Sequence, residues 1–271
     1  MMTTLVRDIM HQGLITCTTN TPLGKVASLL AEYEVHALVV KDGDGKPAGI
    51  ITDFDLLAGE WLSTDKESLA VMKNLTAGDL MTTPIDAIRA DMSLQEAARF
   101  LQEKQVYRLA VQDGEDIAGV LSVSDIVATL AGRVRASREN VGDVMSDAFL
   151  VCRDKTPILS AARAMTWAHW RTVVVVNAQG ALQGVFTSKD LLQFAVKDFD
   201  ENLTVRSVLR PDPITIDIRA SLQAAANLMI QHHLHRLIVV DRNEQDGFPL
   251  GIISASDIVA EMARPGSVWQ V

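Results

Sequence analysis

The chain has 271 residues, a length typical of about two domains, and its 48% hydrophobic and 22% charged residues are typical of a globular protein. No apolar run approaches the roughly 18 residues that span a bilayer, and the N-terminus lacks the layout of a secretory signal. The formal net charge of −9 argues against a nucleic-acid binder. We therefore expect a cytoplasmic protein that binds neither nucleic acid nor membranes.

A seven-residue motif occurs four times along the chain. Each copy reads Gly, two apolar residues, Ser or Thr, two variable residues and Asp, and an apolar helical pattern follows it. The hydroxyl positions are separated by 70, 65 and 67 residues. A period of this length indicates four repeats of one small fold, numbered 1 to 4 below. The copies begin at Gly49, Gly119, Gly184 and Gly251.

Each repeat opens with a short strand rich in Thr and Ile, and an amphipathic helix follows. This helix is predicted from apolar residues at positions i, i+3, i+4 and i+7, which fall on one face. The four stripes are Leu23, Val26, Ala27 and Leu30; Leu94, Ala97, Ala98 and Leu101; Ile158, Ala161, Ala162 and Met165; and Leu222, Ala225, Ala226 and Met229.

The starts of these helices carry different capping signals. Thr21-Pro22 and Thr156-Pro157 predict a Thr N-cap before a Pro at the first helical position. In repeat 2, Ser93 and Glu96 have the spacing of a capping box, and Ser221 takes the place of Ser93 in repeat 4.

Two strands joined by a polar turn come next, and the second helix begins at the motif. The predicted fold class is therefore α+β (mixed α/β). In the opening strands, Cys17 and Cys152 align with Ile88 and Ile216, so we expect reduced thiols at buried apolar sites. The first strand of each joined pair is predicted over 37–40, 109–111, 172–176 and 237–240.

The repeats are more alike in alternate pairs. Repeats 1 and 3 share the Cys, the Thr-Pro and 13 residues from the helix start to a basic residue, His36 or Arg171. Repeats 2 and 4 share the Ile, the Ser and 14 residues from the helix start to Arg108 or Arg236. A duplicated two-repeat unit explains this pattern, with its boundary in the polar stretch 132–140. On this alignment the three arginines occupy corresponding positions.

The motif and repeat openings such as Arg7-Asp8-Ile9-Met10 and Gly78-Asp79-Leu80-Met81 resemble the CBS-domain family. The opening of repeat 4, Arg206-Ser207-Val208-Leu209, departs from that pattern. The resemblance implies four β-α-β-β-α repeats paired into two pseudo-two-fold Bateman modules. The first module then covers 1–133, with repeats at about 6–60 and 75–131, and the second covers 134–271, with repeats at about 141–197 and 204–263.

The resemblance also implies a ligand. Clefts between paired repeats of this family commonly bind adenosine nucleotides or related adenosyl ligands. The motif's Asp contacts ribose hydroxyls, its Ser or Thr contacts phosphate, and a basic pair before the middle strand adds phosphate contacts. That pair is intact only as His235-Arg236. Repeats 2 and 3 keep the Arg, as Arg108 and Arg171, and repeat 1 keeps only His36, so repeats 2 and 4 are better candidates for anionic ligands than repeat 1. The implied nucleotide-binding residues are Thr52, Asp55, Arg108, Ser122, Asp125, Arg171, Thr187, Asp190, His235, Arg236, Ser254 and Asp257.

Elementary chemistry is compatible with that assignment and with a simpler one. The N-terminus of a helix attracts anions, a carboxylate can accept ribose hydroxyl protons, and Arg offers a bidentate phosphate contact. However, a Ser or Thr followed by an acid three positions later is also an ordinary helix start. His232, His233 and His235 have no Cys or acidic cluster beside them, so no metal site is expected.

The sequence contains no catalytic constellation, Walker-type phosphate loop or dinucleotide fingerprint, so we do not expect an enzyme. We expect a regulatory module that binds an adenosine nucleotide: AMP, ADP or ATP, ahead of S-adenosylmethionine or NAD. It would transmit ligand occupancy to an unidentified regulated protein or to its own assembly, with a homodimer favoured over an intramolecular disc. The alternative is a structural protein-interaction module without a specific ligand.

Overall fold

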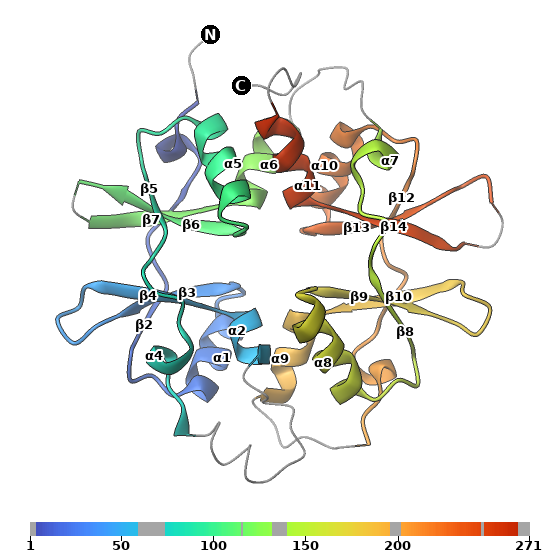
Figure 1. Cartoon of the computed structure of the whole chain (residues 1–271), viewed down its shortest axis with the longest axis horizontal. Helices are drawn as coiled ribbons and strands as arrows, with labels where there is room; N and C mark the ends of the chain where they lie inside the picture. The colour runs from blue at the N-terminus through green and yellow to red at the C-terminus, as the bar shows by residue number, and fades with distance from the viewer. Residues whose placement is uncertain are drawn as a thin grey trace. The chain divides into compact units, whose positions relative to one another are not determined.

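The computed structural model describes residues 4–58, 74–114, 116–131, 140–195, 202–244 and 247–264. Four repeats of the same mixed α/β fold follow one another along the chain, which confirms the predicted fold class (Figure 1). In each repeat a short helical turn leads to a strand, a helix, two further strands and a second helix.

The elements of repeat 1 are η1 (Val6–Asp8), β1 (His11–Gln12), β2 (Thr16–Thr18), α1 (Leu23–Glu32), β3 (Ala37–Lys41), β4 (Pro47–Thr52) and α2 (Asp53–Ala58). Those of repeat 2 are α4 (Ala77–Leu80), β5 (Ala87–Arg89), α5 (Leu94–Glu103), β6 (Arg108–Asp113), β7 (Asp116–Ser122) and α6 (Val123–Ala131). Those of repeat 3 are α7 (Val141–Val144), β8 (Leu150–Arg153), α8 (Ile158–Ala168), β9 (Thr172–Val176), β10 (Leu182–Thr187) and α9 (Ser188–Ala195). Those of repeat 4 are η2 (Val205–Ser207), β11 (Arg210–Pro211), β12 (Thr215–Asp217), α10 (Leu222–Gln231), β13 (Arg236–Val240), β14 (Pro249–Ser254) and α11 (Ala255–Ala263).

The three main strands of each repeat form one sheet. In repeat 1, β2 runs parallel to β3, and β4 runs antiparallel to β3. The other repeats have the same order. In every sheet the hydroxyl residue of the motif lies opposite the first residue of the middle strand. These pairs are Ala37 with Thr52, Arg108 with Ser122, Thr172 with Thr187, and Arg236 with Ser254.

The predicted helices are present, and every residue of the four apolar stripes is buried. The two Ser caps are confirmed as well. Ser93 Oγ accepts a hydrogen bond from the Glu96 backbone N–H, and Glu96 accepts in return from Ser93. Ser221 Oγ accepts from the Ala224 N–H at 3.1 Å. The sequence therefore specifies both the buried face and the start of these helices.

The predicted Thr N-caps are wrong. The helices of repeats 1 and 3 begin one residue later than expected, so Pro22 and Pro157 take the N-cap position. Thr21 Oγ1 instead accepts a hydrogen bond from the Thr18 N–H at 2.9 Å. Thr156 Oγ1 accepts from the Arg153 N–H at 3.1 Å. These hydroxyls close the turn after the opening strand, which competes with capping because the same oxygen cannot reach both donors.

The opening segment of each repeat crosses to the sheet of its neighbour in the sequence. Strand β1 of repeat 1 pairs with β7 of repeat 2, and β11 of repeat 4 pairs with β10 of repeat 3. Isolated bridges join Thr82 to Ile50 and Ser146 to Ile252 in the same manner. This exchange links consecutive repeats, 1 with 2 and 3 with 4.

The first residue of the motif is Gly because the exchanged segment passes very close to it. A Cβ on Gly119 would overlap the carbonyl oxygen of His11, and a Cβ on Gly184 would overlap that of Arg210. Close backbone approach is a recurrent reason for Gly within a strand. The motif Gly is thus explained by packing between repeats.

Contacts divide the chain into two compact units that each draw on both halves of the sequence. Unit 1 combines 1–13, 86–148 and 213–271, and so contains repeats 2 and 4. Unit 2 combines 14–85 and 149–212, and so contains repeats 1 and 3. The units group the same alternate repeats that are most alike in sequence. The expected module boundary after 133 lies outside the described residues, and the modules stay a prediction.

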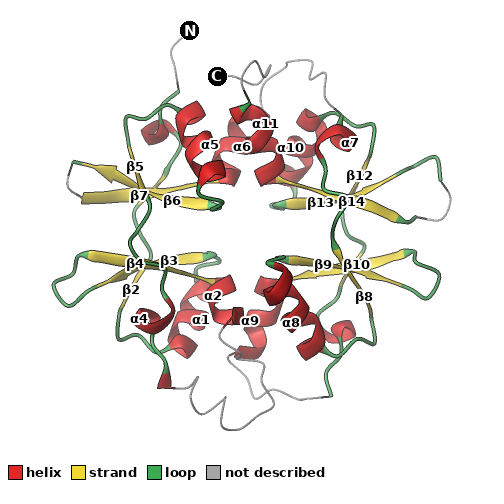
Figure 2. Ribbon diagram, viewed as in Figure 1, coloured by secondary structure: helices red, strands yellow, loops and turns green. Residues whose placement is uncertain are grey.

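The two units differ in how their repeats pack. In unit 1, helices α5, α6, α10 and α11 lie side by side (Figure 2), and one apolar core spans both repeats, with Ile126 of α6 and Ile258 of α11 in the same cluster. In unit 2, helices α1, α2, α8 and α9 meet, but the described buried apolar residues form two clusters, one for each repeat. A buried carboxylate, Asp53, lies where these two repeats meet.

The cysteines are free thiols at the strand sites that the alignment predicted. Cys17 is buried, and Cys152 is half-buried beside the core of repeat 3. Burial raises the pKa of Cys17, and it raises the pKa of Cys152 to about 11. Both groups are therefore uncharged thiols at neutral pH, as expected for core sites.

Candidate functional site

The hydroxyl and the Asp of each motif copy cap the second helix. In repeat 4 the Ser254 backbone N–H and Oγ–H both donate to Asp257 Oδ2, at 2.7 and 2.6 Å. The same two bonds occur in the other repeats, with donor–acceptor distances between 2.7 and 2.8 Å. All eight residues thus have a structural role in the helix start. The remaining pairs are Thr52 with Asp55, Ser122 with Asp125, and Thr187 with Asp190.

The second carboxylate oxygen distinguishes the four copies. His11 Nε2 on β1 lies 2.8 Å from Asp125 Oδ1, and Arg210 Nε on β11 donates to Asp190 Oδ1 at 2.7 Å. In both cases the exchanged strand brings the basic residue. Among the residues that the structure describes, none donates a hydrogen bond to Oδ1 of Asp55 or Asp257. These two carboxylates each retain an acceptor that a ligand hydroxyl could use.

Burial raises the pKa of Asp257, while its hydrogen bonds from Ser254 and the charge of Arg236 lower it by less. The pKa of Asp55 is raised by the same cause and is lowered less by its bonds from Thr52. A half-buried carboxylate whose charge is incompletely compensated favours an additional hydrogen-bond donor. This supports Asp55 and Asp257 as acceptors for hydroxyl groups.

The expected alignment of three arginines is wrong. The register places Arg108 and Arg236 opposite the motif hydroxyl, whereas Thr172 takes that position in repeat 3. Arg171 lies one residue earlier. Its carbonyl oxygen accepts from the N–H of the residue after the hydroxyl, as do those of the equivalent residues in the other repeats, namely His36, Tyr107 and His235. Arg171 precedes β9, whereas Arg236 is the first residue of β13, so the two arginines are not equivalent.

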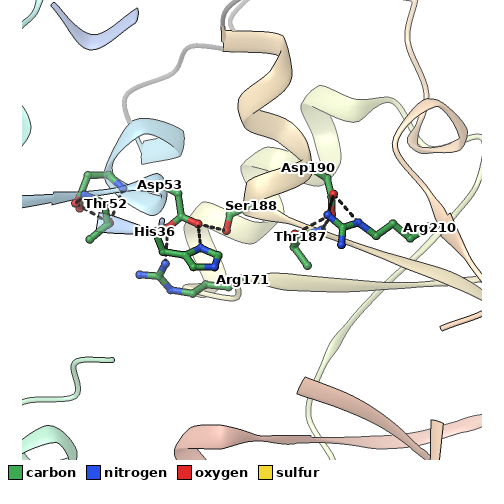
Figure 3. Close-up of polar contacts among 9 residues, drawn as sticks. His36, Thr52, Asp53, Arg171, Thr187, Ser188, Asp190 and Arg210 are labelled. Atoms are coloured by element: carbon green, nitrogen blue, oxygen red, sulfur yellow. Dashed lines mark hydrogen bonds and ion pairs between the residues drawn. The ribbon is translucent and has the colours of Figure 1, made fainter. Parts of the chain in front are cut away.

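In unit 2, Arg171 belongs to a buried cluster around Asp53 (Figure 3). The Asp53 side chain is 1% exposed, and the Arg171 Nη1–H donates to its Oδ1 at 2.8 Å. Asp53 Oδ2 lies 3.0 Å from His36 Nδ1 and accepts from Ser188 Oγ–H at 3.1 Å. The Arg171 guanidinium also lies 4.9 Å from the ring centre of Phe54. The cluster joins repeat 1 to repeat 3 through charged groups.

In unit 1, the equivalent positions make different contacts. His235 Nδ1 of repeat 4 lies 2.6 Å from Ser124 Oγ of repeat 2. The Arg236 guanidinium of repeat 4 lies 5.6 Å from the ring centre of Tyr107 in repeat 2. Both contacts bring the basic pair of one repeat against polar or aromatic groups of the other. Unit 1 therefore collects Arg108, Arg236, His235 and the motif residues of repeats 2 and 4 in one compact body.

Several of these residues were not predicted from the sequence. Asp53, Ser188 and Ser124 occupy the two motif positions that were treated as variable. His11 and Arg210 lie in opening segments that pair with the sheet of the neighbouring repeat, and no sequence pattern predicts this pairing. One signal was present for the arginines: in every repeat the residue opposite the hydroxyl comes 14 positions after the first helical residue. That constant spacing separates Arg171 from Arg236.

The structure also bears on the metal and membrane expectations. In the described ranges no three His, Cys, Asp or Glu side chains are grouped as a metal ion would require. His232 and His233 are exposed just after the end of α10. No described helix has both the length and the apolar character needed to cross a bilayer.

The CBS domain model matches residues 6–60, 77–132, 141–197 and 205–264. The chain therefore belongs to the CBS-domain family, as the motif and the repeat openings predicted. Proteins of this family are in general regulatory rather than catalytic.

Relatives and solved structures span different shares of the chain. Protein MJ1404 of Methanocaldococcus jannaschii is 29% identical over 146 residues, which make up 48% of this chain but only 33% of that protein. Protein MJ1225 of the same organism is 22% identical over 286 residues, covering 97% of this chain and 100% of that protein. The crystal structure of MJ1225, described as a proposed archaeal homologue of g-AMPK, has a TM-score of 0.84 at 20% identity and covers 96% of this chain and 100% of that chain.

A shorter similar structure contains a nucleotide. CBSX2 in complex with AMP is 29% identical, with a TM-score of 0.40, and covers 46% of this chain and 94% of that chain.

Proposed function

We propose that this protein is a regulatory sensor of an adenosine nucleotide, of the AMP, ADP or ATP type, and that unit 1 carries its binding site. Arg236 and His235 contact the phosphate in this proposal, and Arg108 adds positive charge from repeat 2. The N-terminus of α11 attracts the same anion, while both donors of Ser254 bond to Asp257. Asp257 accepts a ribose hydroxyl. Of the twelve expected nucleotide-binding residues, the main contacts are thus assigned to repeat 4.

The observation that carries the proposal is the state of Asp257. One oxygen caps α11, and within the described chain no protein group donates to the other. Arg236 lies near enough for its charge to lower the pKa of this carboxylate, although burial raises the pKa by more. A ribose hydroxyl would supply the missing donor, and a charge-assisted bond of that kind contributes about 1.5–3 kcal/mol.

The competing carboxylate in unit 1 is less suited to a ribose. Asp125 has the same cap, but His11 Nε2 already lies 2.8 Å from its second oxygen. Asp190 in unit 2 is similarly engaged by Arg210. Asp55 retains an open acceptor, but its repeat has Ala37 where repeats 2 and 4 have arginines. Among the contacts of the described residues, only those of repeat 4 combine an Arg opposite the hydroxyl with a carboxylate oxygen that accepts no hydrogen bond.

Signal transmission follows from the position of the site. The basic pair of repeat 4 contacts Ser124 and Tyr107 of repeat 2, so a ligand that draws on Arg236 or His235 changes contacts between the two repeats. A ligand shifts a conformation only as far as it binds one arrangement better than another. The receiving partner is an unidentified regulated protein or a second copy of this chain. For the homodimer, light scattering would have to show a concentration-dependent doubling of mass.

A scaffold without a ligand is the second candidate, and the helix caps favour it. Every motif hydroxyl and Asp has a structural role that requires no nucleotide. The two functions differ in what they predict for Asp257, because a scaffold needs only its capping oxygen.

The test begins with a thermal-shift screen of the whole chain with AMP, ADP, ATP, S-adenosylmethionine and NAD. A ligand at 100 times its dissociation constant stabilises the fold by about 2.7 kcal/mol. Titrations of Asp257→Ala and Asp125→Ala with AMP then separate the roles, because both variants lose the same cap. We expect a loss of roughly tenfold or more in Asp257→Ala and under threefold in Asp125→Ala. Equal losses, or no ligand in the screen, would leave the scaffold as the function.

A further inference from the structure

Asp53 is a buried carboxylate that forms an ion pair with Arg171 inside unit 2. Its carboxylate is 1% exposed and is held by Arg171, His36 and Ser188, with both oxygens engaged. The Arg171 side chain is 20% exposed, so solvent screens the pair only weakly. A guanidinium paired in this way resembles one that has already bound a phosphate or carboxylate ligand.

The equivalent positions in unit 1 lack such an anion. The residue directly after the motif hydroxyl is Asp53 in repeat 1 and Ser188 in repeat 3, but Val123 in repeat 2 and Ala255 in repeat 4. Both apolar residues are buried and belong to the continuous core of unit 1. Because the backbone contacts at this position are the same in all four repeats, the difference lies in the side chains alone.

We infer that Asp53 is a specificity-determining residue that closes unit 2 to phosphate-bearing ligands by occupying Arg171, and thereby confines nucleotide binding to unit 1. The inference rests on the proposed function in one respect: Arg171 lies at the backbone position of His235, which we assign to the phosphate in unit 1.

The physical reason is charge repulsion in a poorly solvated place. A phosphate that approaches Arg171 must either displace the Asp53 carboxylate or settle beside it, and two negative charges near each other in a buried site are strongly unfavourable. Displacement would leave the carboxylate buried with weaker partners, which is also costly. AMP therefore gains little from Arg171 while Asp53 is ionised.

Phe54 holds the Arg171 side chain in position independently of Asp53. Its ring centre lies 4.9 Å from the Arg171 guanidinium, and this contact remains when the carboxylate is neutralised. Asn in place of Asp53 keeps the size of the side chain and an acceptor for Ser188. Asp53→Asn should therefore uncover a cation that is still held in position, rather than release a mobile side chain.

The experiment measures AMP and adenosine binding by titration calorimetry on the whole chain in an Arg236→Ala background, which weakens the proposed unit 1 site. In that background we expect AMP to bind at least tenfold more weakly than to the wild-type protein. Adding Asp53→Asn should tighten AMP binding at least tenfold, with no gain for adenosine. Adding Arg171→Gln as well should abolish the gain, and this triple variant is the matched control because it carries the same Asp53→Asn.

Two results would overturn the inference: AMP affinity that is unchanged by Asp53→Asn in a folded protein, or a gain that survives Arg171→Gln. If Asp53→Asn does not fold, AMP binding is compared between Arg236→Ala and the double variant that also carries Arg171→Gln. AMP binding that remains in Arg236→Ala and is lost in the double variant would show that unit 2 binds phosphate, and would overturn the inference. Failure of the proposed function looks different, since the wild-type protein would then not bind AMP, or Arg236→Ala would bind it equally well. A gain on adding Asp53→Asn would support the inference even in that case.

Discussion

Units 1 and 2 use the same backbone positions to join two repeats, but with opposite chemistry. Unit 1 buries Val123 and Ala255 there and has one apolar core across both repeats. Unit 2 buries Asp53 and Ser188 there, and the ion pair of Asp53 with Arg171 lies beside apolar contacts such as that of Leu57 with the core of repeat 3. The repeated fold thus fixes where the two repeats meet, and one side chain decides whether that place is apolar or ionic.

The two units differ in whether a basic residue takes part in the packing between repeats. In unit 1 one apolar core spans both repeats. In unit 2 the positive charge of Arg171 is part of the interface. A buried ion pair contributes little net stability over an apolar contact, but breaking it by removing one partner is costly. Unit 2 should therefore tolerate loss of its basic residue much less than unit 1.

The largest expected effect tests that asymmetry. Arg171→Ala should lower the free energy of unfolding by about 3–5 kcal/mol, because it leaves Asp53 buried without its cation. His235→Ala changes the equivalent residue of unit 1, which contacts the neutral Ser124, and should cost about 0.5–1.5 kcal/mol. Urea unfolding of both variants provides the comparison. Equal losses would mean that the Asp53 cluster is no more important than the neutral contact.

Binding should show the reverse asymmetry. Arg236→Ala should weaken AMP binding by about 1.5–3 kcal/mol, the range for a hydrogen bond to a charged group. Thr172→Val changes the residue at the same register position in unit 2 and keeps its volume, so AMP affinity should stay within twofold. Titration with AMP and with adenosine checks the assignment. If Arg236→Ala lost affinity for both ligands equally, Arg236 would not be a phosphate contact.

Close backbone packing at the motif Gly should be the same in both units, so the expected differences between the units are limited to their side chains. Gly119→Ala in unit 1 and Gly184→Ala in unit 2 each place a Cβ against a backbone carbonyl of the exchanged segment. Each should cost about 1–3 kcal/mol of unfolding free energy, as overpacking does. The control is Gly24→Ala within α1, where nothing lies within 4 Å of the new Cβ and a gain of about 0.5–1 kcal/mol is expected. Thermal or urea unfolding that ranks Gly24→Ala with the other two would contradict the packing role of the motif Gly.

The smallest effect concerns the opening strands. Unit 2 has Cys17 where unit 1 has Ile88 or Ile216, and all three side chains are buried. Cys17→Val should therefore change the free energy of unfolding by less than about 1.5 kcal/mol, because the substitution nearly conserves volume. Cys17→Asp is the contrasting variant, since it buries a charge without a partner and should cost much more. A Cys17→Val loss as large as that of Cys17→Asp would show that the thiol has a role beyond packing.

Local chemistry explains which features the sequence revealed. The apolar stripes and the Ser93 capping box depend on short-range spacing, and the four repeats depend on a short motif that recurs along the chain; all three are confirmed. Thr21 was misassigned because a Thr hydroxyl serves a turn as readily as a helix start. The helix caps formed by the motif were among the alternatives that the sequence left open.

The missed features depend on which repeats meet in space. Asp53 looks like any acid in the first turn of a helix until Arg171, more than a hundred residues away, is seen beside it. The exchange that brings His11 and Arg210 to motif carboxylates is equally non-local. Arg171 itself was recoverable, because the constant spacing from the helix start places Thr172, and not Arg171, opposite the motif hydroxyl.

A crystal structure of the whole chain grown with AMP tests the central claim most directly. We expect nucleotide density in unit 1, with the phosphate at Arg236 and a ribose hydroxyl within hydrogen-bond distance of Asp257 Oδ1. We also expect Asp53 to remain paired with Arg171 in unit 2, as it is without ligand. A phosphate bound to Arg171 with the Asp53 carboxylate displaced, and no nucleotide at Asp257, would contradict the claim.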